Sequence, residues 1–131
     1  MLRIFVTRQT RYPANTKELK GRLKKFLSRR GATDCDVSLA LVGTRKMKEL
    51  AKSYLHEDDT IHEVLSFPAD NPPAGGGEFA VAEDARLQLG DIVICYPEAL
   101  KIAMKKNRMV DDVLGELAEH GMLHLLGIHH E

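Results

Sequence analysis

Residues 36–55 read DVSLALVGTRKMKELAKSYL, and the period of their apolar side chains changes at Gly43. Before Gly43, apolar and polar residues alternate, which predicts a strand over 36–42. After it, apolar residues recur three and four positions apart, which predicts an amphipathic helix with Thr44 as its capping residue. The residues expected on its apolar stripe are Met47, Leu50, Ala51, Tyr54 and Leu55. A strand followed at once by a helix indicates a layered fold of both element types.

The same two periods predict the remaining elements. Further strands are expected at 2–7, 62–67 and 90–95, and further helices at 15–31, at 97–107 and from Asp111 or Asp112 to 126. Asn15 and Glu18 have the spacing of a capping box, and Gly31 and Gly127 are expected helix ends. Residues 69–78 have the composition of a loop, and 79–88 receive no assignment. This order predicts a single α+β domain over 1–131, with a small mixed β-sheet packed against helices.

The chain has the size and composition of one globular domain. Of its 131 residues, 44% are hydrophobic and 29% are charged. No apolar run approaches the roughly 18 residues of a membrane-spanning helix, and residues 2–6 are too short and too charged for a signal peptide. Cys35 and Cys95 form no CxxC pair, so neither a disulfide scaffold nor a cysteine zinc site is predicted. We expect a cytoplasmic protein without a membrane partner.

Charge is divided unequally along the chain. The 19 basic and 19 acidic residues cancel overall, but residues 1–55 carry a net charge of +10 and residues 56–131 a net charge of −10. A basic half can follow the phosphates of a nucleic acid, and the alternative is that the two halves neutralise each other in the fold. Because aromatic residues make up only 5% of the chain, we expect contacts to an RNA backbone rather than stacking on bases. The residues expected to bind RNA are Lys24, Lys25, Arg29 and Arg30.

Histidines are concentrated near the end of the sequence. His120 and His124 are four positions apart on the last predicted helix, so both rings lie on one face and can bind one ion. Gly127 is expected to turn the chain back, after which either His130 or His129 supplies a third ligand. A lone helical histidine is more often a surface or core residue, and a terminal cluster can be an expression tag. The pair, the glycine and the following histidines together favour a zinc site.

The spacing HxxxHxxGxxH, with His130 in the last position, is that of the metzincin zinc proteases, so a zincin-like arrangement of the histidine-bearing helix is expected. Those enzymes carry a general-base Glu directly after the first histidine, where this chain has Gly121. Glycine has no side chain to accept a proton, so a peptidase is disfavoured and another metal-assisted hydrolysis stays open. The carboxylates that are candidates to orient a ligand histidine are Asp91, Glu116 and Glu119.

Residues 120–130, 64–68 and 89–94 read HGMLHLLGIHH, VLSFP and LGDIVI. In order and spacing these segments resemble HGxLHLxGxxH, VLSFP and LGDIxI of the YbeY family, bacterial metal-dependent endoribonucleases and ribosomal RNA maturation factors. The similarity extends over most of the chain from about residue 36. It implies one zinc ion held by His120, His124 and His130, and cleavage of single-stranded RNA in the cytoplasm. It also implies maturation of 16S ribosomal RNA at its 3′ end, ribosome quality control, and contact with the ribosome or its small subunit.

The chain departs from the family pattern at several positions. Ile128 and His129 stand where the family usually has an aromatic residue and Asp, and His62 and Glu63 stand where it has Thr and then Asp or Asn. Most members also continue into another helix after the third histidine. His56 stands where the family has an Arg thought to contact RNA, which makes His56 the candidate catalytic residue. Unlike Arg, a histidine is charged only when protonated and cannot bind a phosphate with a bidentate grip.

The mechanism expected from these observations is attack on a phosphodiester with the help of zinc. The helix over 15–30 and the basic residues Arg45, Lys46 and Lys48 would hold the strand through its phosphates. Two alternatives stay open. One is an RNA-binding or ribosome-binding module with a structural or vestigial zinc site, and the other is a zinc peptidase whose Glu comes from elsewhere in the chain.

Overall fold

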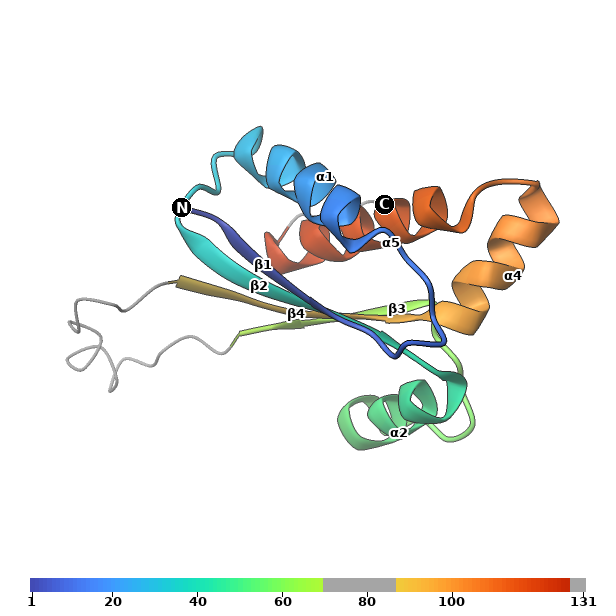
Figure 1. The fold of residues 1–131 in the computed structure, drawn as a ribbon. Helices are drawn as coiled ribbons and strands as arrows, with labels where there is room; N and C mark the ends of the chain where they lie inside the picture. The colour runs from blue at the N-terminus through green and yellow to red at the C-terminus, as the bar shows by residue number, and fades with distance from the viewer. Residues whose placement is uncertain (70–86, 128–131) are drawn as a thin grey trace.

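The computed structural model describes residues 1–69 and 87–127. Within these ranges every predicted strand and helix is present, in the predicted order (Figure 1). The bounds are Arg3–Thr7 for β1, Thr16–Ser28 for α1, Cys35–Val42 for β2, Thr44–Leu55 for α2, Val64–Pro68 for β3, Leu87–Cys95 for β4, Tyr96–Lys106 for α4 and Val110–Leu125 for α5.

The strands form one mixed sheet in the order β1-β2-β4-β3. β1, β2 and β4 run parallel, whereas β3 pairs with β4 in the antiparallel direction and forms one edge of the sheet. The predicted α+β fold with a small mixed sheet is therefore confirmed. The β3–β4 pairing depends on Gly90, which has a φ of +138° and whose added Cβ would lie 2.3 Å from the carbonyl oxygen of Phe67. Only glycine combines that backbone conformation with so close an approach.

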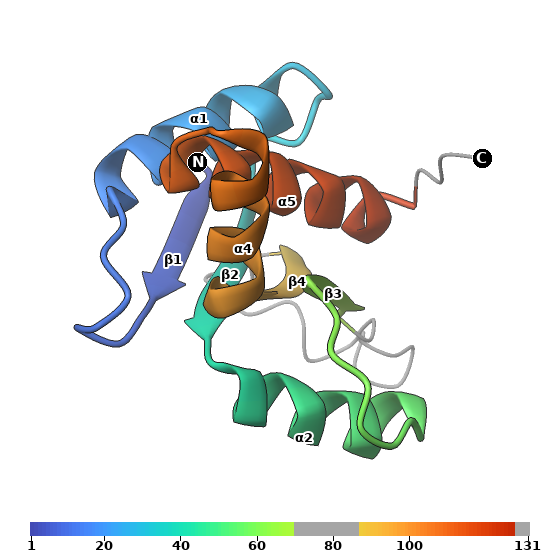
Figure 2. The ribbon, with the colours of Figure 1, turned by 90° about the vertical axis from the view of Figure 1, so that its right-hand side faces the viewer.

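Helices cover the two faces of the sheet unequally. α1 and α5 pack against each other on one face, and α2 lies on the opposite face (Figures 1 and 2). The larger core lies between the sheet and the α1–α5 layer, and includes the fully buried Leu23, Ile92 and Leu114. A smaller core under α2 includes Met47 and Cys95. Each large aliphatic side chain buried in this way stabilises the fold by roughly 1.5–3 kcal/mol, so α5 is held firmly on the sheet.

Two of the predicted helix caps are wrong. Gly43, not Thr44, is the capping residue of α2, and no side chain caps that end. The last helix begins after Met109, so Asp111 and Asp112 lie in its first turn. There a carboxylate is stabilised by the positive end of the helix dipole without being the cap itself.

The predicted cap of the first helix is confirmed. The side chain of Asn15 accepts a hydrogen bond from the backbone N–H of Glu18 at 3.0 Å. The backbone N–H of Asn15 in turn donates to the carboxylate of Asp111 at 3.1 Å. Asp111 therefore ties the start of α1 to the start of α5, a contact across 96 positions of sequence that fixes the two helices relative to each other.

The segment between β3 and β4 was expected to be a loop followed by an unassigned stretch. Residues 70–86 lie outside the described part of the chain, whereas residues 87–89 extend β4 toward the N-terminal side of its predicted start. Among the described helices, none has both the length and the apolar character needed to cross a membrane.

Candidate functional site

The two histidines of α5 lie on the side of the helix that faces the edge strand β3. α5 packs along β3 and β4, and His120 and His124 lie in its last turns. His120 is exposed and His124 is half-buried, so solvent reaches both rings. We name the cavity in front of them the histidine pocket. It has a volume of about 300 Å³ and is lined by His120, His124, Val64, Leu65, Ser66 and Pro68.

The two imidazole rings converge on one point. Their Nε2 atoms are 3.1 Å apart, and their ring centroids are 4.7 Å apart. Two ligands of a tetrahedral zinc ion, each roughly 2.0–2.1 Å from the metal, lie roughly 3.3 Å from each other. His120 and His124 therefore fit two positions of one zinc ion without a change in the helix backbone.

The third predicted ligand, His130, and its alternative, His129, lie outside the described residues. The turn that precedes them is described: α5 ends at Leu125, and Gly127 has a φ of +80°, as predicted for a glycine that ends a helix. In residues 1–69 and 87–127, no three His, Cys, Asp or Glu side chains are grouped as metal ligands. The described part of the chain thus contains two candidate ligands, and the third stays a prediction.

Gly121 lies where helix α5 comes closest to the sheet. A Cβ added at this position would lie 2.9 Å from Cγ2 of Ile92 and 3.0 Å from Oγ of Ser66. Ser66 also donates a hydrogen bond to the carbonyl oxygen of Gly121 at 3.2 Å, which joins β3 to the histidine-bearing turn. A Glu at position 121 would have to fit between helix and sheet. The sequence argument against a metzincin-type base is therefore reinforced by a lack of space.

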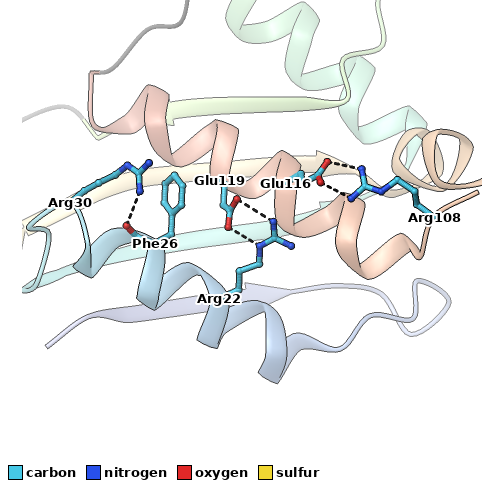
Figure 3. Close-up of polar contacts among 6 residues, drawn as sticks. All are labelled: Arg22, Phe26, Arg30, Arg108, Glu116 and Glu119. Atoms are coloured by element: carbon cyan, nitrogen blue, oxygen red, sulfur yellow. Dashed lines mark hydrogen bonds and ion pairs between the residues drawn. The ribbon is translucent and has the colours of Figure 1, made fainter. Parts of the chain in front are cut away.

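The three carboxylates considered as partners of the ligand histidines bind other groups. Figure 3 shows Glu119 accepting two hydrogen bonds from Arg22 at 2.7 and 3.1 Å, and Glu116 accepting two from Arg108 at 2.8 and 2.5 Å. The Arg108 hydrogen bonds hold the pKa of Glu116 below its usual value. Asp91 accepts a hydrogen bond from the hydroxyl of Ser38. These contacts give no support to a role of the three carboxylates in orienting the histidines.

The four basic residues predicted to bind RNA are exposed on α1 or just after it. α1 packs on α5 and β1, and α5 lies between α1 and β3 (Figure 2). Arg30 is partly engaged: its guanidinium lies 3.8 Å from the ring centroid of Phe26 and donates to the Phe26 carbonyl at 3.3 Å (Figure 3). The structure does not bring these residues into the histidine pocket, and their contact with RNA stays a prediction.

His56, the candidate catalytic residue, is the C-terminal cap of α2. It is exposed and has a φ of 58°, the left-handed conformation that non-glycine residues seldom adopt. Because α2 covers the face of the sheet opposite to α5, His56 does not line the histidine pocket. A catalytic role for His56 stays a prediction.

A second cavity, which no sequence pattern predicted, lies on the α2 face of the sheet. It has a volume of about 470 Å³, and its lining includes Lys46, Leu50 and Tyr54 of α2 together with Ser38, Asp91 and Phe67 of the sheet. We name it the aromatic pocket because the rings of Tyr54 and Phe67 lie 5.1 Å apart there. Tyr54, expected on the apolar stripe, is 64% exposed. The four-residue spacing of the α2 residues was visible in sequence, but their partners on the sheet follow only from the strand order.

Comparison with known proteins links the whole described fold to one family. The model of a family described as Endoribonuclease YbeY matches residues 5–131. A protein named Endoribonuclease YbeY from Anaeromyxobacter sp. (strain Fw109-5) is 34% identical over 115 residues, which cover 88% of this chain and 54% of that protein. One of the same name from Acinetobacter baumannii (strain ATCC 17978) is 39% identical over 98 residues, which cover 75% of this chain and 58% of that protein.

The chain thus spans little more than half the length of these curated relatives. A solution structure of a protein from Thermotoga maritima has a similar fold, with a TM-score of 0.61 at 24% sequence identity. That alignment covers 98% of this chain and 75% of the Thermotoga chain. The similarity supports the architecture of sheet and helices independently of the sequence motifs.

Proposed function

This chain belongs to the YbeY endoribonuclease family, and on that premise we propose that it cleaves single-stranded RNA with a zinc ion bound by the histidines of α5. The observation that carries the proposal is the convergence of the His120 and His124 Nε2 atoms, 3.1 Å apart, in a solvent-open pocket. We assign the third ligand position to His130, with His129 as the alternative. A zinc ion with three histidine ligands acts as a Lewis acid and makes water deprotonate near neutral pH.

The edge strand β3 supplies polar groups beside the two histidines. Hydrogen bonds from Cys95 N–H to the Glu63 carbonyl (2.9 Å) and from Ala69 N–H to the Leu89 carbonyl (3.1 Å) flank the β3–β4 ladder. Along a strand of an antiparallel pair, backbone N–H groups point alternately toward the partner strand and away from it. Since Glu63 and Ala69 form hydrogen bonds with β4, Val64 and Ser66 direct their backbone N–H groups away from β4. These N–H groups point toward the open edge next to the histidine pocket, where they can donate to phosphate oxygens of an RNA strand.

Ser66 and Gly121 hold this arrangement together. The hydroxyl of Ser66 donates to the carbonyl oxygen of Gly121, one residue after His120, and this hydrogen bond joins β3 to the turn of α5 that carries His120. Preorganised donors of this kind need no rearrangement when a charged substrate arrives. In the proposal β3 therefore positions the phosphodiester and α5 positions the metal ligands.

The proposal extends to ribosomal RNA as the target. It includes maturation of the 3′ end of 16S ribosomal RNA, ribosome quality control, and contact with the small subunit, in the cytoplasm. Support for these finer statements comes from the resemblance of the three sequence motifs to the YbeY family. They are tested by incubating the protein with a precursor of this RNA bound to small subunits and mapping the cleavage site.

The direct test of the proposed function is a cleavage assay on single-stranded RNA with metal analysis of the same samples. His124→Ala should lose both bound metal and RNA cleavage. His62→Ala is the matched control, because His62 pairs with Glu57 at 2.6 Å outside the histidine pocket, and it should keep both. RNA cleavage by His124→Ala at the rate of the parent protein would overturn the metal mechanism.

The same samples distinguish the proposed nuclease from the alternative, an RNA-binding module without turnover. Its support is the missing base at Gly121 together with the position of His56 outside the pocket. It predicts RNA binding by the parent protein with no product at any metal concentration. Casein cleavage without RNA cleavage would instead indicate the zinc peptidase, which the close packing at Gly121 disfavours.

A further inference from the structure

The aromatic pocket and the histidine pocket lie against the same edge strand. Pro68 of β3 lines both cavities; the aromatic pocket extends from it to α2, and the histidine pocket extends from it to His120 and His124 of α5. A polymer that crosses β3 can therefore occupy both. The volume of the aromatic pocket, about 470 Å³, falls within the roughly 300–1,000 Å³ of sites that bind small molecules. A part of the substrate other than the scissile phosphate has room to bind there.

Two aromatic rings form one wall of this pocket. Tyr54 and Phe67 come from α2 and β3, and their centroids are 5.1 Å apart with a tilt of 56°. Tyr54 remains 64% exposed, although an aromatic ring is costly to leave in water. An unpaired nucleobase stacks on such rings, and each stacked base contributes substantially to the affinity for single strands.

Polar groups lie beside the rings in a row across the sheet. Ser38 of β2 is paired in register with Asp91 of β4, and Asp91 is paired with Phe67 of β3. Asp91 accepts a hydrogen bond from Ser38, yet a carboxylate offers about four acceptor positions, so it retains capacity for a ligand. A carboxylate accepts from the amino groups of adenine, cytosine or guanine. Uracil places a carbonyl group on each side of its N–H, and these repel a carboxylate.

A positive charge completes the pocket. Lys46 lies in the first turn of α2, one and two turns before Leu50 and Tyr54 on the same side of the helix, and its side chain is exposed. An ammonium group attracts the phosphate of a nucleotide whose base lies against Tyr54. The cavity therefore combines a stacking surface, an acceptor for an amino group and a cation, which are the features of a nucleotide-binding site.

We propose that the aromatic pocket binds one unpaired, amino-bearing nucleobase of the RNA strand whose phosphodiester lies at the histidine pocket. This inference rests on the proposed function for its substrate class. It assigns base contacts to a chain whose low aromatic content predicts contacts to the RNA backbone alone. It also gives the protein a preference for adenine, cytosine or guanine over uracil at one position near the cleaved bond.

The test uses nucleotide binding, which does not require cleavage. Tyr12 and Tyr96 are buried and stacked at 4.9 Å, and the chain has no Trp, so Tyr54 is the exposed fluorophore among its three tyrosines. Titration of the full chain with GMP, AMP or CMP should quench this fluorescence and give a calorimetric affinity. Tyr54→Ala should weaken that affinity roughly five- to hundredfold. Leu55→Ala, the neighbouring exposed apolar residue of α2 outside the pocket, should leave it unchanged.

Further variants separate the parts of the proposal. Asp91→Asn should bind UMP as tightly as GMP, since an amide can both donate and accept. Lys46→Ala should lower the salt dependence of the nucleotide affinity, whereas Lys52→Ala should not. Nucleotide binding is measured on metal-free protein, so failure of the metal mechanism leaves this result intact. Equal affinities of Tyr54→Ala and Leu55→Ala would overturn the proposal. Equal affinities of the parent protein for UMP and GMP would also overturn it. Displacement of the nucleotide by an aromatic peptide of equal affinity would do the same, because it would identify a protein-binding surface.

Discussion

Replacement of Gly121 by alanine tests the close contact between the histidine-bearing helix and the sheet. The added Cβ would lie 2.9 Å from Cγ2 and 3.2 Å from Cδ1 of Ile92, and 3.0 Å from Oγ of Ser66. Ile92 is fully buried and β-branched, so it has no alternative rotamer into open space. The helix must therefore move away from β3 and β4, or the side chains must adopt strained conformations.

Two opposing effects determine the size of this change. An extra methyl group in a close-packed site costs about 1–3 kcal/mol of folding free energy. The exchange of glycine for alanine inside a helix contributes about 1 kcal/mol in the favourable direction. We expect Gly121→Ala to lower the free energy of unfolding by about 1 kcal/mol, and to weaken metal binding because the turn that carries His120 shifts relative to Ser66.

Gly21→Ala is the matched control. Gly21 lies within α1, and an added Cβ there would meet no atom within 4 Å, so only the helix propensity changes. Urea unfolding of both variants should place Gly21→Ala about 1–3 kcal/mol above Gly121→Ala, a difference that isolates the steric cost. An Ile92→Ala background should reduce that difference, since it removes two of the close atoms. Equal stabilisation of the protein by Gly121→Ala and Gly21→Ala would refute a steric clash at Gly121.

Two further outcomes follow from single residues. Arg108 lowers the pKa of Glu116, so the ion pair stabilises the fold at pH values above the ordinary pKa of Glu. This contribution is lost as the pH falls through the lowered pKa of Glu116. Glu116→Gln should lower the free energy of unfolding by about 0.2–1 kcal/mol at pH 7 and by nothing in strong acid, as measured by urea unfolding at a series of pH values. His56→Gly should raise the thermal midpoint by removing a left-handed non-glycine residue, and more so than Asn107→Gly, because Asn tolerates that conformation better. If His56 contacts RNA, the same variant cleaves more slowly despite its stability, and equal cleavage contradicts that role.

Local periodicity was sufficient to predict the elements of this fold. The alternation over 36–42 and the three-to-four spacing after Thr44 both correspond to observed elements. The helix caps were harder to predict, because Asp111 accepts a hydrogen bond from the backbone of Asn15, which is far away in sequence. A cap prediction weighs only local hydrogen bonds, and it cannot include a partner that arrives through tertiary packing.

The candidate site was predictable where it depends on one helix. The four-residue spacing of His120 and His124 is enough to bring their rings together. By contrast, Glu119 is close to them in sequence but is bound by Arg22 of α1, which also joins the basic half of the chain to the acidic half. The aromatic pocket needed the strand order, since Tyr54 and Phe67 meet only when β3 lies beside β4. Composition and periodicity do not predict contacts between elements that are far apart in sequence.

We propose that His120 and His124 hold one zinc ion together with a histidine that follows Gly127. Competition with a chelator would measure the zinc affinity of the parent protein and of three variants: His124→Ala, His130→Ala and His129→Ala. Loss of a direct ligand should cost more than the roughly 10–100-fold caused by changes to groups behind the ligands. We expect such losses for His124→Ala and His130→Ala, and a zinc affinity close to that of the parent protein for His129→Ala. A His124→Ala protein that binds zinc as tightly as the parent would contradict this proposal.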